Sequence, residues 1–296
     1  MPSFRYRTYG LNVESEIECP DLQPWAGEPQ VHVRYGVVPP RLENPLHELD
    51  WYQSSETEFL LNLEGVGRFW VNRGVEIRVE PDASVSVEQV QAYTFGSIFG
   101  IVLHQRRQLP LHASAIATED GAVLFTGPSG YGKSTLAGEF SRRGYRIIAD
   151  DICAATTLDG VPHLHPARPT ILLRADSMER LNLDYRGLSP APHNPAKRMV
   201  SVAEASDLNP VPIRAIYALN PSETSAIRLT PLTGFEKIAT LTANVYRVYL
   251  LSGTDALSTY FGELTTLARS AAVVKIERPI QPFLLTELAD KIEEDL

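Results

Sequence analysis

Near the middle of the chain the sequence reads Gly127-Pro128-Ser129-Gly130-Tyr131-Gly132-Lys133-Ser134, a complete G-x-x-x-x-G-K-[ST] pattern. An apolar run (residues 122–126) precedes it, and a helix-like segment (residues 135–143) follows. In this context the glycines let successive backbone N–H groups turn toward an anion, and the helix N-terminus adds partial positive charge. The pattern therefore predicts a phosphate-binding loop that holds a nucleoside triphosphate, ATP or another.

Each residue of this loop has an expected task. Lys133 is expected to reach the β- and γ-phosphates, and the hydroxyl of Ser134 to hold a Mg²⁺ that bridges the same oxygens. The other residues expected around the phosphates are Gly127, Ser129, Gly130, Tyr131, Gly132 and Thr135.

The composition is that of an ordinary soluble protein, and it argues against nucleic acid and membranes as partners. The chain has 296 residues, 44% hydrophobic and 21% charged, with a formal net charge of −9. That acidic balance argues against a nucleic-acid footprint, which needs clustered Lys and Arg. The two cysteines, Cys19 and Cys153, have neither disulfide-framework nor zinc spacing, so a cytoplasmic location is expected. No apolar run reaches the ~20 residues of a membrane span, and no signal peptide is recognised, so no membrane association is expected.

The order of predicted elements indicates a mixed α/β protein with two domains. Residues 1–90 are expected to form a β-rich lobe, and residues 91–296 a nucleotide-binding catalytic domain. Strands are expected at residues 4–9, 31–35, 58–63, 67–71, 75–80, 109–117, 122–126, 145–149, 153–158, 161–165, 214–219, 226–232 and 272–276. Helices are expected at residues 90–105, 135–143, 177–183, 234–245, 255–269 and 286–295, and the proline-rich residues 189–197 are expected to form a mobile loop.

Two adjacent carboxylates, Asp150 and Asp151, end the strand that follows the loop helix. A carboxylate at such a strand end is a usual partner of nucleotide Mg²⁺, and two in a row allow one to hold the metal while the other accepts a proton. The alternative is that they only end the strand and cap the next turn. His112, on the strand before the loop, either tunes that proton acceptor or is a buried core histidine.

Three segments together resemble the C-terminal catalytic domain of the HPr serine kinase/phosphorylase family. They are residues 111–115 (Leu-His-Ala-Ser-Ala), residues 125–135 around the loop, and residues 143–151 (Arg-Gly-Tyr-Arg-Ile-Ile-Ala-Asp-Asp). A weaker likeness extends through Lys197-Arg198 to the C-terminal helices. The resemblance implies a mixed-sheet nucleotide domain similar to phosphoenolpyruvate carboxykinase, and it leaves a homo-oligomer possible.

The resemblance also implies residue roles. His112 and Asp150 would serve proton transfer, and Ser134 would bind Mg²⁺. With Asp150 as the proton acceptor, we expect Asp151 to position Mg²⁺ together with Ser134. Thr135 stands where the bifunctional enzymes usually have Glu, and the glycine-rich signature after their metal-binding Glu is not evident at residues 170–177. These departures argue against a phosphorylase half-reaction. The N-terminal lobe does not resemble the regulatory domain of those enzymes, which argues against HPr as the substrate.

The sequence is most similar to the stand-alone HPr-kinase-like proteins of lasso-peptide maturation clusters. That likeness implies an ATP-dependent kinase that phosphorylates a serine of a ribosomally made precursor peptide, with Lys197 and Arg198 as candidate substrate contacts. Two alternatives remain at this point. One is a small-molecule kinase or nucleotide hydrolase, and the other is a non-catalytic, nucleotide-gated peptide-binding protein.

Overall fold

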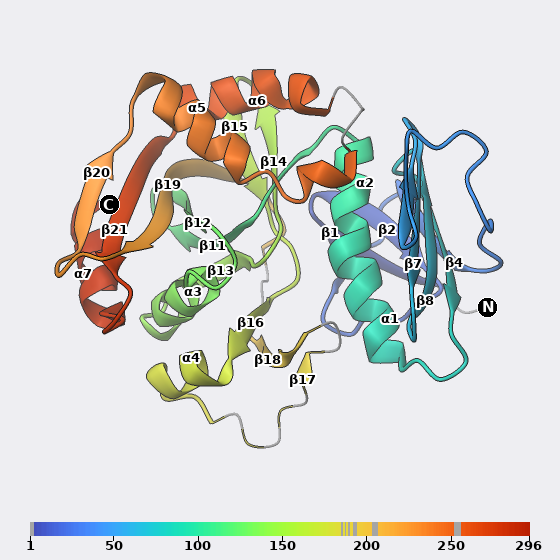
Figure 1. The fold of residues 1–296 in the computed structure, drawn as a ribbon, viewed down its shortest axis with the longest axis horizontal. Coiled ribbons are helices and arrows are strands. Elements are labelled where there is room, and N and C mark those ends of the chain that lie inside the picture. The colour runs from blue at the N-terminus through green and yellow to red at the C-terminus, as the bar shows by residue number, and fades with distance from the viewer. Residues whose placement is uncertain are drawn as a thin grey trace. The chain divides into compact units, whose positions relative to one another are not determined.

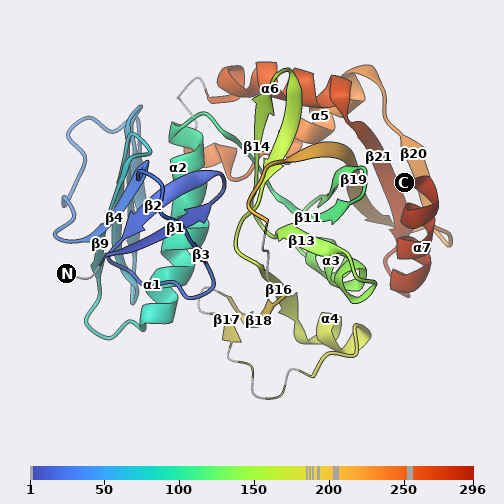
Figure 2. The same ribbon diagram turned by 180° about the vertical axis from the view of Figure 1, so that it is seen from behind.

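A computed structural model describes residues 3–184, 186, 188, 190–191, 194–202, 207–251 and 256–296. The chain divides into two compact units (Figures 1 and 2). The first comprises Met1–Pro110 with Tyr246–Phe261, and the second Leu111–Val245 with Gly262–Leu296. The change-over at Pro110 lies beyond the boundary predicted after residue 90, because the helical segment that follows packs with the N-terminal strands.

The first unit is built on a sheet with strand order β3-β1-β2-β4-β9-β8-β7-β6-β5. Strands predicted at residues 31–35 and 58–63 are confirmed to the residue. The strands that escaped prediction are β3, β5 and β6, which have only two or three residues, and β2, which is as long as β1. The strands are β1 (Phe4–Thr8), β2 (Leu11–Ser15), β3 (Gln23–Pro24), β4 (Val31–Tyr35), β5 (His47–Leu49), β6 (Tyr52–Ser54), β7 (Glu58–Leu63), β8 (Gly67–Asn72) and β9 (Glu76–Pro81).

One long helical segment covers this sheet. It runs as α1 (Val87–Tyr93), a π-helical turn (Thr94–Ile98) and α2 (Phe99–Gln105), and it begins with a capping box in which Ser86 and Gln89 satisfy each other's backbone N–H groups. Phe95 and Phe99 stack on each other with ring centroids 5.7 Å apart. Phe95 also contacts Tyr6 of β1, and Phe99 contacts Tyr9 in the turn after β1, so the apolar face of the helix belongs to the first unit's core.

The second unit contains a mixed sheet in which the path β14-β15-β19-β12-β11-β13 continues from β19 to β21 and β20. Its strands are β11 (Ala113–Thr118), β12 (Gly121–Thr126), β13 (Arg146–Ala149), β14 (Cys153–Leu158), β15 (Val161–His165), β19 (Val211–Ser222), β20 (Arg228–Pro231) and β21 (Ala272–Pro279), with β10 (Leu109–Leu111) at the change-over. The predicted hairpin at residues 153–165 is confirmed.

Strand direction brings four strand ends to one edge of this sheet. β12 runs parallel to β19, and β19 runs parallel to β21. β11 is antiparallel to both β12 and β13, so β13 runs in the same direction as β12. The carboxyl ends of β13, β12, β19 and β21 therefore meet at one edge, where ligands of open α/β sheets bind.

Helices α3 (Lys133–Arg142) and α7 (Leu285–Asp295) bury apolar faces in the core of the second unit. Phe140 of α3 stacks on Phe125 of β12 with centroids 5.2 Å apart, and Ile292 of α7 is fully buried in the same cluster. This packing fixes the start of α3 directly after β12. The other helices are α4 (Ala175–Arg180), α5 (Gly234–Ala243), a 3-10 turn (Val248–Leu251) and α6 (Ala256–Ser270).

A separate three-stranded sheet has the order β16-β18-β17, with β16 (Thr170–Arg174), β17 (Pro190–Ala191) and β18 (Asn194–Ser201). The prediction of a loop at residues 189–197 is wrong where the structure describes them, because β18 pairs with β16 in a ladder that a local proline count cannot reveal. Residues 189, 192 and 193 of that prediction lie outside the described part of the chain.

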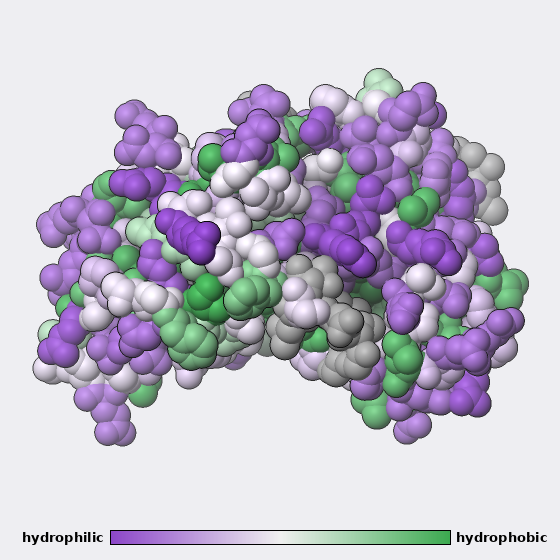
Figure 3. Space-filling model, turned by 90° about the horizontal axis from the view of Figure 1, so that it is seen from above, coloured by the Kyte–Doolittle hydropathy of each residue, from purple (hydrophilic) through white to green (hydrophobic). Residues whose placement is uncertain are grey.

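The surface carries scattered apolar side chains. Figure 3 shows one face on which hydrophilic residues predominate and hydrophobic ones stand singly or in small groups. Within the described ranges, no helix is long and apolar enough to cross a membrane.

Candidate active site

The loop from Gly127 to Ser134 connects β12 to α3 and has the backbone that its glycines require. Gly127, Gly130 and Gly132 have φ of 133°, 86° and 96°, a region in which L-residues are strained. A Cβ at Gly132 would lie 3.0 Å from Cζ of Phe283, whereas a Cβ at Gly130 would meet nothing within 4 Å. The loop is therefore tightly packed at Gly132 and open at Gly130.

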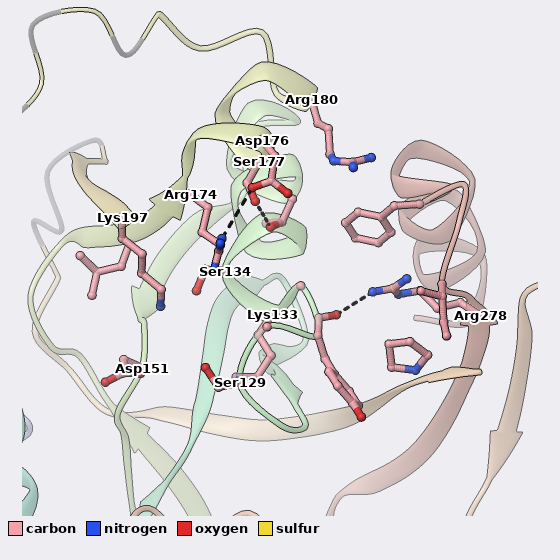
Figure 4. Close-up of a pocket in the computed structure, with 18 of the residues that line it drawn as sticks. Ser129, Lys133, Ser134, Asp151, Arg174, Asp176, Ser177, Arg180, Lys197 and Arg278 are labelled. Atoms are coloured by element: carbon pink, nitrogen blue, oxygen red, sulfur yellow. Dashed lines mark hydrogen bonds and ion pairs between the residues drawn. The ribbon is translucent and has the colours of Figure 1, made fainter. Parts of the chain in front are cut away.

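A cavity of about 340 Å³ lies over this loop (Figure 4). The cations among its lining residues outnumber the carboxylates, although the whole chain carries a net charge of −9. The cationic lining residues are Lys133, Arg174, Arg180, Lys197 and Arg278, and the acidic ones are Asp151 and Asp176. This concentration of positive charge suits a polyanion.

Lys133 is the first residue of α3 and is only 7% exposed. Its Nζ donates to the carbonyl oxygens of Gly127 (2.7 Å) and Pro128 (3.2 Å), and it lies 3.0 Å from Nε2 of His112. Burial lowers the pKa of Lys133 to about 8, although Asp151 and Asp150 act in the opposite direction. The ammonium group is therefore held at the loop without a direct carboxylate contact.

His112 stands at the break between β10 and β11, where its backbone N–H donates to the carbonyl of Asn244. Because the Lys133 ammonium can only donate, Nε2 of His112 accepts, and the proton is on Nδ1. Nδ1 then donates to the carbonyl oxygen of Asp151 at 3.0 Å and lies 3.5 Å from its Oδ1. Burial, and then the Lys133 charge, lower the pKa of His112, so the neutral tautomer is the resting form.

Asp150 follows directly after β13, and its carboxylate is fully engaged. Oδ1 accepts from the hydroxyls of Ser114 (2.5 Å) and Ser134 (2.9 Å), and Oδ2 accepts from the backbone N–H of Leu172 (2.9 Å). Burial raises the pKa of Asp150, more than these hydrogen bonds lower it. The contact with Ser134 links the acidic strand end to the phosphate loop.

Asp151 turns away from this arrangement. Its φ of 70° is a left-handed conformation, which Asp tolerates better than most residues. Its side chain is 37% exposed and lines the cavity, whereas Asp150 is not among the lining residues. The contacts thus pair Ser134 with Asp150 and His112 with Asp151, the reverse of the pairing that the sequence predicts.

Asn244, the C-cap of α5, also holds the loop and was not singled out from the sequence. Its Oδ1 accepts from the backbone N–H of Gly127 at 3.0 Å, and its Nδ2 donates to the carbonyl of Thr240 at 2.8 Å. Thr135, predicted near the phosphates, lines the cavity but donates its hydroxyl proton to Ser177 at 2.8 Å. The start of α3 is therefore tied to α4.

Of the two predicted substrate contacts, one reaches the cavity. Lys197 lines it, directly opposite Arg174 in the β16–β18 ladder. Arg198, the next residue along the strand, donates to the carbonyls of Pro195 and Lys197 and is not among the lining residues. Alternation along β18 places these neighbours on opposite faces.

The site offers few side chains that could bind a metal ion. No group of three or more His, Cys, Asp or Glu side chains suited to a metal ion occurs in the described part of the chain. Mg²⁺ at nucleotide sites needs fewer, because it binds one or two protein oxygens together with phosphates and water. The oxygens of Ser134 and Asp150, 2.9 Å apart beside the loop, fit that requirement.

Comparison with known proteins adds little. No protein-family model matches this chain, and no curated protein matches it significantly. Among solved structures, the Hpr(Ser) kinase/phosphatase from Coxiella burnetii aligns with 63% of this chain and 89% of its own, at 15% identity and a TM-score of 0.34. A likeness at that level supports no inference about activity, so function must be argued from the site.

Proposed function

We propose that this chain is a kinase that transfers the γ-phosphoryl group of ATP, or of another nucleoside triphosphate, to a serine hydroxyl of a ribosomally made precursor peptide. One observation carries the proposal. His112 lies 3.0 Å from Nζ of Lys133 in the phosphate loop and 3.5 Å from the Asp151 carboxylate, so a candidate proton-transfer pair and a phosphate loop share one site. A site that only binds a nucleotide has no need of proton-transfer groups.

The loop would hold the donor. Its backbone N–H groups and the start of α3 would face the phosphates, and Lys133 would move from the loop carbonyls to the β- and γ-oxygens. Ser134 would hold Mg²⁺ from the cavity, with the Asp150 carboxylate, which accepts from the Ser134 hydroxyl, behind it. When bound, that ion supplies positive charge that stabilises the negative charge developing on the transferred group.

Asp151 is the better candidate for the proton acceptor. The Asp151 side chain reaches the cavity. His112 contacts Asp151 through Nδ1 and Lys133 through Nε2, so the imidazole ring orients the carboxylate. The Asp150 oxygens already accept three hydrogen bonds, and the raised pKa of Asp150 follows from the same burial that keeps it out of the cavity. In the proposed step the serine oxygen attacks the γ-phosphorus, its proton passes to Asp151, and the bond to the leaving nucleoside diphosphate breaks.

The peptide acceptor rests on the sequence resemblance together with the charge of the cavity. Arg174 and Lys197 lie directly opposite each other on neighbouring strands, a like-charge pair that a bound anion would stabilise beyond the 3.9 Å ion pair of Arg174 with Asp176. A peptide whose serine is close to its C-terminal carboxylate would supply that anion beside the acceptor hydroxyl. Arg198, which bonds to its own strand's carbonyls, has no part in this arrangement.

Incubation with γ-labelled ATP tests the proposal. The acceptors would be a serine peptide that ends in a free carboxylate and the same peptide with alanine for serine. Label on the serine peptide alone supports the proposal. Release of free phosphate only, or label on an added metabolite, would point instead to a hydrolase or a small-molecule kinase. Nucleotide binding with neither product would indicate a nucleotide-gated binding protein.

Two isosteric variants separate the roles of the carboxylates. Asp151→Asn should keep nucleotide affinity and lower the transfer rate by about 10²- to 10⁴-fold, the range expected for loss of a general base. Asp150→Asn should weaken the dependence of nucleotide binding on Mg²⁺. If Asp150→Asn bound Mg²⁺ and nucleotide normally while Asp151→Asn remained active, the roles predicted from the sequence would be restored.

A further inference from the structure

Three side chains form an arginine–phenylalanine cluster at the end of the cavity away from Asp151. Arg180 belongs to α4, Arg278 to β21, and Phe283 to the connection before α7. Cζ of Arg278 lies 4.1 Å from the centroid of the Phe283 ring, and Cζ of Arg180 lies 5.5 Å from it. All three line the cavity, and Figure 4 shows Arg180 and Arg278 on one side of it with Asp151 and Lys197 on the other.

The protein satisfies the cluster only in part, although Nη1 of Arg278 donates to the carbonyl of Pro279 at 2.8 Å. Arg278 is only 5% exposed, and burial, then the nearby Arg180, lower its pKa to about 10. Its Nη2 donates to the carbonyl of Tyr131 in the phosphate loop at 2.9 Å, but its Nε is buried with no partner among the residues that the structure describes. Two guanidinium groups thus share one aromatic ring, and among the described residues no ion pair neutralises either.

The order of strand ends sets the direction of a bound triphosphate. Asp151 lies just after β13 and Arg278 near the end of β21, and the phosphate loop lies between them on the same edge. Lys133 and Ser134 act on the β- and γ-phosphates, and Lys133 touches His112. The γ-phosphate therefore points toward His112 and Asp151, which leaves the α-phosphate and the nucleoside on the side of Arg278.

We infer that the base of the donor nucleotide stacks against the Arg180–Phe283–Arg278 cluster, which makes these residues the nucleoside subsite of the cavity. This inference rests on the proposed function for the direction of the triphosphate. Planar guanidinium and aromatic groups both stack on nucleobase faces, and such stacking is tolerant of base identity. Purine nucleotides should therefore bind alike, and nothing in the cluster demands one purine over the other.

A comparison of ATP with inorganic tripolyphosphate isolates the base and ribose from the phosphates. Binding is measured by calorimetry with the full chain and Mg²⁺. Phe283→Leu removes the ring and should raise the Kd for ATP about tenfold, or about 1.4 kcal/mol, while leaving the Kd for tripolyphosphate unchanged. Arg180→Lys keeps the charge but loses the planar stacking group, so it should weaken ATP in the same selective way.

Matched controls lie on the surface of the second unit. Phe235, on α5, is 82% exposed, so Phe235→Leu repeats the chemical change away from the cavity. Arg269→Lys on α6 is the matched control for Arg180→Lys, because it makes the same chemical change outside the cavity. Neither should alter the Kd for ATP or for tripolyphosphate. Phe283 packs partly against the core, so Phe283→Leu could also disturb folding. Arg180 is exposed, so Arg180→Lys tests the same subsite without that effect.

Three results would overturn the inference. They are equal weakening of ATP and tripolyphosphate in both variants, unchanged ATP binding in both, and a wild-type protein that binds ATP no more tightly than tripolyphosphate. Because the readout is binding, it is independent of the proposed phosphoryl transfer. Selective loss of ATP affinity with no labelled acceptor would support this subsite and refute the kinase. A labelled acceptor without selective loss of ATP affinity in the variants would support the kinase and refute this subsite.

Discussion

The buried ammonium group of Lys133 should make nucleotide binding depend on pH above neutrality. Its pKa of about 8 in the free protein means that it is mostly charged at pH 7 and about one-tenth charged at pH 9. A bound triphosphate would favour the charged form and raise that pKa. Stabilisation of the complex by Lys133 is thus fully present well below pH 8 and is lost progressively as pH rises from the free-state pKa toward the higher pKa of the complex.

The expected size follows from the charged fraction. Between pH 7 and pH 9 the Kd for ATP should rise about tenfold, equivalent to about 1.4 kcal/mol. At pH 9 each binding event should take up close to one proton, which calorimetry in buffers of different ionisation enthalpy measures directly. His112 has a lowered pKa and would not titrate in this range.

The control is Lys133→Met, which should bind ATP weakly at every pH and take up no proton between pH 8 and pH 9. An unchanged Kd from pH 7 to pH 9 in the wild-type protein would refute the reasoning. So would proton uptake that persists in Lys133→Met, because another group would then be responsible.

Further predictions concern the residues that shape the loop and the acceptor end of the cavity. Gly132→Ala adds a Cβ 3.0 Å from Phe283 at a φ of 96°, so ATP affinity should fall about tenfold. The control is Gly144→Ala, which has a φ of 97° and no atom within 4 Å of the added Cβ, and it should leave ATP affinity unchanged. Asn244→Ala leaves the buried N–H of Gly127 without its acceptor, so urea unfolding should show a loss of about 1–2 kcal/mol, with the exposed Asn220→Ala near zero. Lys197→Ala should raise KM for a free-acid serine peptide more than for its C-terminal amide, and Arg198→Ala should change neither; equal effects on both peptides would remove the proposed carboxylate contact.

The phosphate loop and its flanking elements could be predicted because each is encoded locally. Glycines at 127, 130 and 132 occupy left-handed conformations that their positions in the pattern require. The strand that ends at Ala149 and the hairpin after it have local apolar and Asp-Gly signals, and both lie where expected. Most helices of the second unit also begin and end within a few residues of the prediction.

The contacts of the site are the part that the sequence left open. Adjacent residues Asp150 and Asp151 give no sign of which one faces Ser134, because that depends on the turn at Asp151 and on Ser114 from another strand. Asn244 and Arg278 reach the loop from more than a hundred residues away, through a helix cap and a parallel strand. Such pairings follow from tertiary structure and have no local signature.

A crystal structure with Mn²⁺ and a non-hydrolysable ATP analogue would test the arrangement of loop, metal and acid pair in one measurement. We predict triphosphate density over residues 127–134 and an anomalous peak at Ser134 on the side of Asp150, with Asp151 directed at the γ-phosphate. A nucleotide bound elsewhere, or a metal held by Asp151 with Asp150 directed at the γ-phosphate, would contradict this assignment.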